Sequence, residues 1–108
     1  MKTVIEVAKH FSDVPAGRFF TDGPFSGEAF RENHLRPALE KGGVVVVELD
    51  GSEGYGSSFL EEAFGGLVRN NYFTTKDLRA RLHLTSDDRS LVEEVWRYID
   101  TAKPLGGH

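Results

Sequence analysis

The sequence predicts a small single-domain α/β fold in which helices pack on a mixed four-stranded sheet. The four valines at residues 44–47 are β-branched and place apolar side chains on both faces, which is typical of a strand covered on both sides. Other β-rich segments alternate along the chain with segments whose apolar residues recur at helical spacing. With 108 residues the chain can bury one core and is too short for two.

The first 40 residues are predicted to form two short strands and a helix. Three β-branched apolar residues favour a strand over residues 3–7, and the aromatic stretch 18–20, which lies between two turn-forming segments, favours a second. Ser26 is placed to cap a helix over residues 27–40. Pro37 must either kink that helix or lie in the first turn of a second short one.

The last third of the chain is predicted to form a short helix, a strand and a long helix. The short helix spans about residues 75–80, and alternation over residues 82–84 predicts a strand beside the central one. The final helix starts at Ser86 or Asp87 and has a core-facing stripe at three- and four-residue spacing. The stripe consists of Leu91, Val92, Val95, Trp96 and Ile99.

Composition narrows the classes of function. The chain has no cysteine, which excludes disulfides and thiolate metal sites and fits a reducing compartment. It has no apolar run near the roughly 20 residues that span a bilayer and no signal-peptide pattern, so we expect a cytoplasmic protein without a membrane partner. Its formal net charge of -4 argues against nucleic acid as the main partner. We expect one domain over residues 1–103 and a flexible tail over residues 104–108.

The candidate site is the junction between the central strand and the helix that follows it. The strand ends at Asp50, the loop 51–56 contains three glycines, and the next residues are Ser57 and Ser58. In open α/β sheets, ligands and regulators usually meet the fold at the carboxyl ends of the strands. Ser58, followed three residues later by Glu61, matches a capping box for a helix over residues 58–69.

Two glycines interrupt the central helix, and each is about 1 kcal/mol less favourable there than alanine. We favour close packing against a neighbouring element, or an early helix end, as the reason; the alternative is a flat outward patch for a partner. The expected patch consists of Glu61, Glu62, Gly65, Gly66 and Arg69. The loop residues Asp50, Gly54, Tyr55 and Gly56 complete the expected partner-binding surface.

The glycine-containing loop matches no nucleotide or hydrolase signature. Gly51, Gly54 and Gly56 have neither the spacing of the dinucleotide fingerprint nor that of a P-loop. Phe59 stands where a nucleophile elbow centred on Ser57 would need its second glycine. The four histidines have no spacing that identifies a base for that serine or a metal site. We therefore expect no enzymatic activity, no metal and no cofactor.

The order of a valine-rich strand with an acidic end, a glycine-containing turn, two serines and a helix start is similar to the anti-sigma factor antagonist, or STAS, group. In that group the strand is followed by Asp-Ser-Ser-Gly-Leu. Residues 25–28, 44–50 and 57–68 resemble more closely the bacterial STAS-like domain family of unknown function. The resemblance covers about residues 17–100 and implies a small STAS-like fold.

The resemblance implies a non-enzymatic regulatory module that binds a protein partner. In the best-understood cases the partner is a histidine-kinase-like ATPase of the GHKL type, and phosphorylation of a serine at the helix start switches the module off. By position that serine corresponds to Ser57, with Ser58 beside it. Gly56 stands where the group has its Asp, and Phe59 stands where it has its Gly.

Three alternatives remain open at this point. In the first, the two serines at the helix start serve only as caps. In the second, the glycine loop and the helix amino end hold the phosphate of a small ligand or nucleotide. In the third, Ser57 is the nucleophile of a hydrolase.

Overall fold

Three parallel strands form the sheet in the computed structural model, which describes residues 1–106. The strands are β1 (Lys2–Glu6), β2 (Val44–Glu48) and β3 (Leu82–Thr85), and β2 lies between the other two. Val45 is the register partner of Thr3 on one side and of Leu82 on the other. The central position of β2 is therefore as predicted.

The sheet is not the mixed four-stranded sheet that the sequence predicted. Residues 18–20 form no strand; Phe20–Asp22 is a short 3₁₀ turn, η2. The Asp22 carboxylate accepts hydrogen bonds from the backbone N–H groups of Arg18 and Phe19 at 3.1 and 2.9 Å. A short polar side chain that binds nearby backbone in this way competes with strand pairing, and here it keeps an aromatic segment in a turn.

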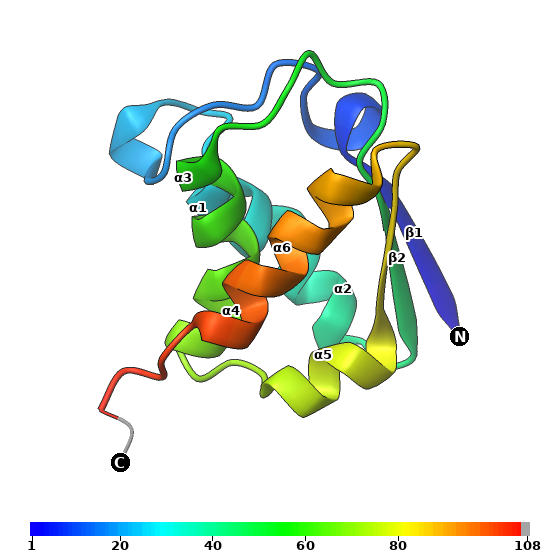
Figure 1. The fold of residues 1–108 in the computed structure, drawn as a ribbon, viewed down its shortest axis with the longest axis vertical. Helices are drawn as coiled ribbons and strands as arrows, with labels where there is room; N and C mark the ends of the chain where they lie inside the picture. Colours follow the sequence, from blue (N-terminus) through cyan, green and yellow to red (C-terminus); the bar gives the residue numbers. More distant parts are fainter. Residues whose placement is uncertain (107–108) are drawn as a thin grey trace.

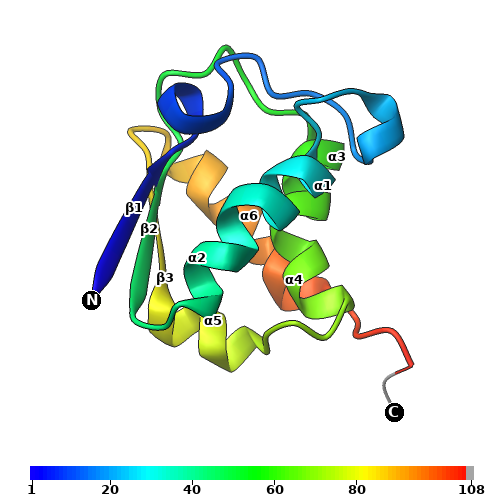
Figure 2. The same cartoon turned by 180° about the vertical axis from the view of Figure 1, so that it is seen from behind.

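Helices cover only one face of the sheet, which Figures 1 and 2 show from opposite sides. Val45 and Val47 are fully buried beneath the helices, whereas Val44 and Val46 stay partly exposed on the other face. The expectation that the central strand is covered on both sides is therefore wrong. Valine suits any pleated, half-buried surface, so four in a row do not by themselves require two covering layers.

The helical layer contains two long segments, each of which passes through a π-helical turn. The first comprises α1 (Gly27–Phe30), η3 (Arg31–Leu35) and α2 (Arg36–Glu40), and the second α3 (Ser57–Leu60), η4 (Glu61–Gly65) and α4 (Gly66–Arg69). The other helical elements are η1 (Val7–Phe11), α5 (Thr75–Arg81) and α6 (Arg89–Thr101). The core lies between this layer and the sheet, with Phe30, Phe59 and Phe64 fully buried in it.

The first long helical segment agrees with the sequence prediction at Ser26 and at Pro37. Ser26 caps it, since its Oγ accepts a hydrogen bond from the Ala29 N–H at 3.1 Å. Pro37 lies in the first turn of α2, directly after the π-helical turn, where the missing proline N–H is least costly. The segment continues across the proline to Glu40.

Leu105 lies beside the end of α4. The Leu105 N–H donates to the Arg69 carbonyl at 2.8 Å, and the Asn71 side chain donates to the Leu105 carbonyl at 2.9 Å. Of the expected flexible tail, residues 107–108 lie outside the described residues, and the boundary at residue 103 stays a prediction.

The crossing of the two long helical segments depends on Gly27, because a Cβ at this position would overlap the Phe59 carbonyl oxygen. We expect Gly27→Ala to lower the free energy of unfolding by about 1–3 kcal/mol, the usual cost of overpacking. Urea titration of the variant and the wild type measures this difference in the free energy of unfolding. Asn33→Ala, at an exposed position of the same segment, is the matched control and should change stability by less than about 0.5 kcal/mol. Equal stability of the two variants would contradict the close approach.

Candidate functional site

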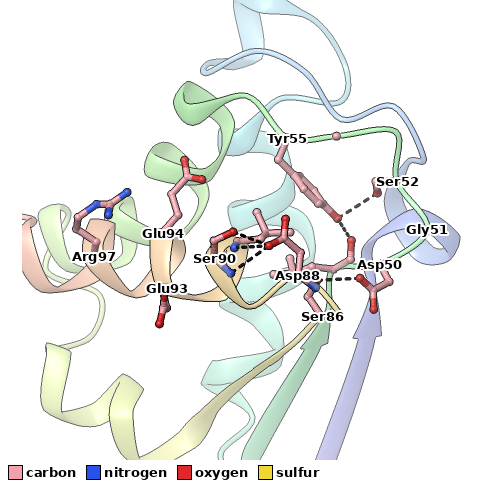
Figure 3. A pocket seen from close by; sticks show the side chains of 13 residues that line it. Asp50, Gly51, Ser52, Tyr55, Ser86, Asp88, Ser90, Glu93, Glu94 and Arg97 are labelled. Carbon is pink, nitrogen blue, oxygen red and sulfur yellow. Dashed lines mark hydrogen bonds between the residues drawn. The ribbon is translucent and has the colours of Figure 1, made fainter.

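The loop between β2 and α3 is folded around the side chain of Tyr55, at the carboxyl end of the sheet (Figure 1). The Tyr55 hydroxyl donates to the Leu49 carbonyl at 2.8 Å and lies 3.0 Å from Ser52 Oγ, as Figure 3 shows. Its ring packs on Phe59 at a centroid distance of 5.8 Å. Burial raises the pKa of Tyr55, so the hydroxyl remains a donor. The loop thus has a defined shape.

Asp50 joins this loop to the next one along the sheet. Its carboxylate accepts a hydrogen bond from Ser86 Oγ at 2.8 Å and one from the Asp87 N–H at 3.1 Å. Since Ser86 and Asp87 follow β3, the acidic end of β2 positions the segment that leads into α6. That helix begins at Arg89, rather than at Ser86 or Asp87 as predicted, and its N-cap Asp88 accepts a hydrogen bond from the Ser90 N–H at 3.0 Å.

An acidic hollow of about 560 Å³ lies between the loop and the start of α6 (Figure 3). Its lining includes Asp50, Gly54 and Tyr55 from the predicted site, together with α6 side chains that the sequence did not indicate. The carboxylates that line it are Asp50, Asp88, Glu93 and Glu94, beside the cation Arg97. Four carboxylates around one opening are unfavourable for a phosphate group. Ser57 and Ser58 do not line the hollow.

The two serines lie at the start of the central helix, and their side chains are exposed. The helix begins at Ser57, and its N-cap is Gly56, with an extended backbone at φ -70° and ψ 150°. Within residues 1–106 no side chain caps this helix start. The predicted capping box of Ser58 and Glu61 is therefore wrong, because Ser58 lies inside the first turn and Glu61 is held by two arginines.

One known protein family matches the part of the chain that contains β2, the β2–α3 loop and the central helix. Residues 26–91 match the model of the family described as STAS-like domain of unknown function (DUF4325). The chain belongs to this STAS-like family. The match confirms the resemblance seen in the sequence and runs from the cap of α1 to the first turn of α6. No curated protein and no solved structure shows significant similarity to the chain.

The outer side of the central helix in this STAS-like domain is largely covered. Glu62 is only 5% exposed, and Gly65 and Gly66 are buried, so the expectation that these three residues face outward is wrong. Glu61 and Arg69 stay partly exposed and bind each other through a short hydrogen bond. The part of the predicted partner surface that remains accessible is therefore the loop and the helix start.

Close packing explains both glycines of the central helix in this STAS-like domain. A Cβ at Gly66 would overlap Arg31 Nη1, and one at Gly65 would lie 3.2 Å from the Tyr98 carbonyl oxygen. The Arg31 guanidinium uses this space to donate to the Glu62 carboxylate and to the Glu62 carbonyl, each at 2.7 Å. The favoured explanation from the sequence is thus confirmed.

Other kinds of site receive no support within the described residues. Over residues 1–106, no group of three or more His, Asp or Glu side chains is placed to hold a metal ion. In the same residues, no histidine forms a hydrogen bond with Ser57 or Ser58. No helix in this part of the chain combines the length and the apolar character needed to cross a membrane.

Glu61 links the segment before α1 to the end of the central helix, since its carboxylate forms ion pairs with both Arg18 and Arg69. Burial raises the pKa of Glu61, but hydrogen bonds from Arg69 and Arg18 outweigh it, so the pKa lies below its ordinary value. The stabilisation from this carboxylate is therefore fully present above its unfolded-state pKa and is lost as the pH falls through the lower folded-state pKa.

We expect Glu61→Gln to flatten the acid dependence of stability. The free energy of unfolding of the variant should fall less steeply than that of the wild type between about pH 5 and pH 3, measured by urea titration at each pH. Glu53→Gln, at an exposed loop carboxylate, is the matched control and should follow the wild-type curve. Parallel curves for Glu61→Gln and the wild type would show that the ion pairs contribute nothing in solution.

Proposed function

We propose that this STAS-like domain is a non-enzymatic regulatory module that binds a protein partner through the β2–α3 loop and the start of the central helix. Phosphorylation of Ser57 is the proposed switch, with Ser58 as the neighbouring candidate. The observation that supports it is that both hydroxyls are exposed and that neither caps the helix. It counts against the alternative in which the two serines only cap the helix.

The helix start can accommodate a phosphate without unfolding. A phosphate on Ser57 adds nearly two negative charges next to backbone N–H groups that no side chain caps within residues 1–106. The helix dipole favours negative charge at this end, whereas a partner that binds the neutral surface meets a changed charge and shape. The fold is therefore expected to survive the modification while the docking surface changes.

We propose that the partner is a histidine-kinase-like ATPase of the GHKL type, as the resemblance to the STAS group implies. A GHKL-type histidine-kinase-like ATPase would meet Gly56 where the STAS group has an Asp. It would also meet a helix whose Phe59, at the position of the group's Gly, is buried and contributes nothing to the surface. Recognition here would therefore depend on the loop shape and on the two serines.

A nucleotide sensor at the same loop is the weaker alternative, because the hollow beside the loop is lined by carboxylates that repel phosphate. Isothermal titration calorimetry with ATP and GDP separates the two functions. The switch requires no heat of binding from either nucleotide, and saturable binding would favour the sensor.

Calorimetry with a purified GHKL-type ATPase, taken from a gene next to that of the domain, tests the switch. We expect Ser57→Asp to weaken binding roughly tenfold or more and Ser57→Ala to leave it near the wild-type value. The melting temperature of Ser57→Asp should not fall, since a negative charge at a helix start is favourable.

Thr101→Asp is the matched control, because it adds the same charge at an exposed position on the last residue of α6. It should bind like the wild type. Unchanged affinity of Ser57→Asp, beside a wild-type domain that does bind, would remove Ser57 from the mechanism. Peptide mass spectrometry of the domain after incubation with ATP and the ATPase reports which serine is modified.

A further inference from the structure

The face of the sheet that carries no helices has a distinct pattern of side chains. Figures 1 and 2 both show the helices on the opposite face only. Strand alternation places every second residue on the uncovered face, as the exposure of Val4 and Val46 beside buried Ile5 and Val47 confirms. The uncovered face consists of Lys2, Val4 and Glu6 from β1, Val44, Val46 and Glu48 from β2, and His83 and Thr85 from β3.

The middle of this face is apolar. Val4 is 42% exposed and is the register partner of Val46, which in turn lies opposite His83. An open hollow of about 660 Å³ lies on this face and is lined by Met1, Lys2, Val44, Val46, His83 and Thr85. A contiguous apolar patch of one exposed and two partly exposed valines is typical of a contact surface.

The two ends of the face carry opposite charge. Lys2 lies at the amino end of β1, while Glu6 and Glu48 are direct register partners at the carboxyl ends of β1 and β2. Like charges directly opposite each other destabilise a sheet. Within residues 1–106 neither carboxylate forms an ion pair, and neither does Lys2. The face thus presents one cation, an apolar middle and a pair of uncompensated carboxylates in that order.

We infer that this face joins two copies of the chain in a twofold-symmetric dimer. A half-turn about an axis that lies midway between the two sheets, parallel to them and perpendicular to their strands, places β1 over β1 with opposite direction. Lys2 of each copy then meets Glu6 of the other, with Glu48 on the next strand, and the valines meet in the middle. This arrangement is self-complementary, as a twofold interface must be. A parallel arrangement would instead bring the four carboxylates together.

The geometry is that of two sheets packed face to face, which ordinarily lie about 10 Å apart with their strands within about 30° of each other. Each sheet then has helices on its outer face only, so the dimer is a four-layer structure. The β2–α3 loop lies at the strand ends and outside this interface. The inference is therefore independent of the proposed switch.

Sedimentation equilibrium over roughly 1–100 μM tests the dimer, and we expect the wild type to populate the dimer mass within this range. Val46→Lys should raise the dissociation constant roughly 30-fold or more, since it places a charge in the middle of the interface. Ala80→Lys, at an exposed position on α5, is the matched control and should leave the constant unchanged. Circular dichroism of each variant verifies folding.

A charge exchange tests the antiparallel arrangement. Lys2→Glu and Glu6→Lys should each weaken the dimer roughly tenfold, and the double variant Lys2→Glu/Glu6→Lys should restore the wild-type constant. A wild-type monomer at every concentration overturns the inference, and so does a dimer that Val46→Lys leaves intact. If both single variants weaken the dimer and the double variant does not restore the wild-type dissociation constant, the antiparallel arrangement is overturned.

Discussion

The buried ion pair between Arg31 and Glu62 determines how the central helix lies. The Arg31 side chain leaves the first helical segment, passes through the space that Gly66 leaves free, and ends on the Glu62 carboxylate. Two buried charges lose their hydration, and only a full set of hydrogen bonds offsets that loss. Arg69 donates to the other Glu62 oxygen at 3.0 Å, and Glu32 accepts from Arg31 Nε at 2.9 Å.

This pair has a consequence for the candidate site. Because the two long helical segments are held together by Arg31 and Glu62 and by the contact at Gly27, the central helix is fixed along its length. Its first turn is packed into the core through Phe59 and Leu60, whereas Ser57 and Ser58 at its start are exposed. The exposed start of this helix, which no side chain caps within residues 1–106, holds Ser57 and Ser58 in one place, as the proposed docking surface requires.

One-sided coverage of the sheet separates the two surfaces of this STAS-like domain. The loops at the carboxyl ends of β2 and β3 are joined by Asp50 and form one edge. The valines on the uncovered face form a second surface. The proposed partner surface and the proposed dimer surface therefore do not overlap.

Sequence patterns predicted the parts of the fold that depend on local physics. The valines at residues 44–47 indicated the central strand, the stripe on the last helix indicated its buried side, and Ser26 indicated a cap. The family was also identified from the strand, loop and helix start. At the site, Asp50, Gly54 and Tyr55 line one hollow because they follow one strand end, and their role in partner binding stays a prediction.

Features that depend on distant partners were not predictable. Glu61 and Glu62 were expected to face solvent, and only the arginines at positions 18 and 31 in another segment explain where they lie. The Asp22 side chain replaced a predicted strand with a turn, and α6 supplied two of the four carboxylates that line the acidic hollow without a sequence signal. Periodicity and capping act within a few residues of the chain, and the sequence alone determined the features that depend on them. Ion pairs, close glycine contacts and uncovered faces join residues that are far apart in the chain, so only the tertiary structure decided them.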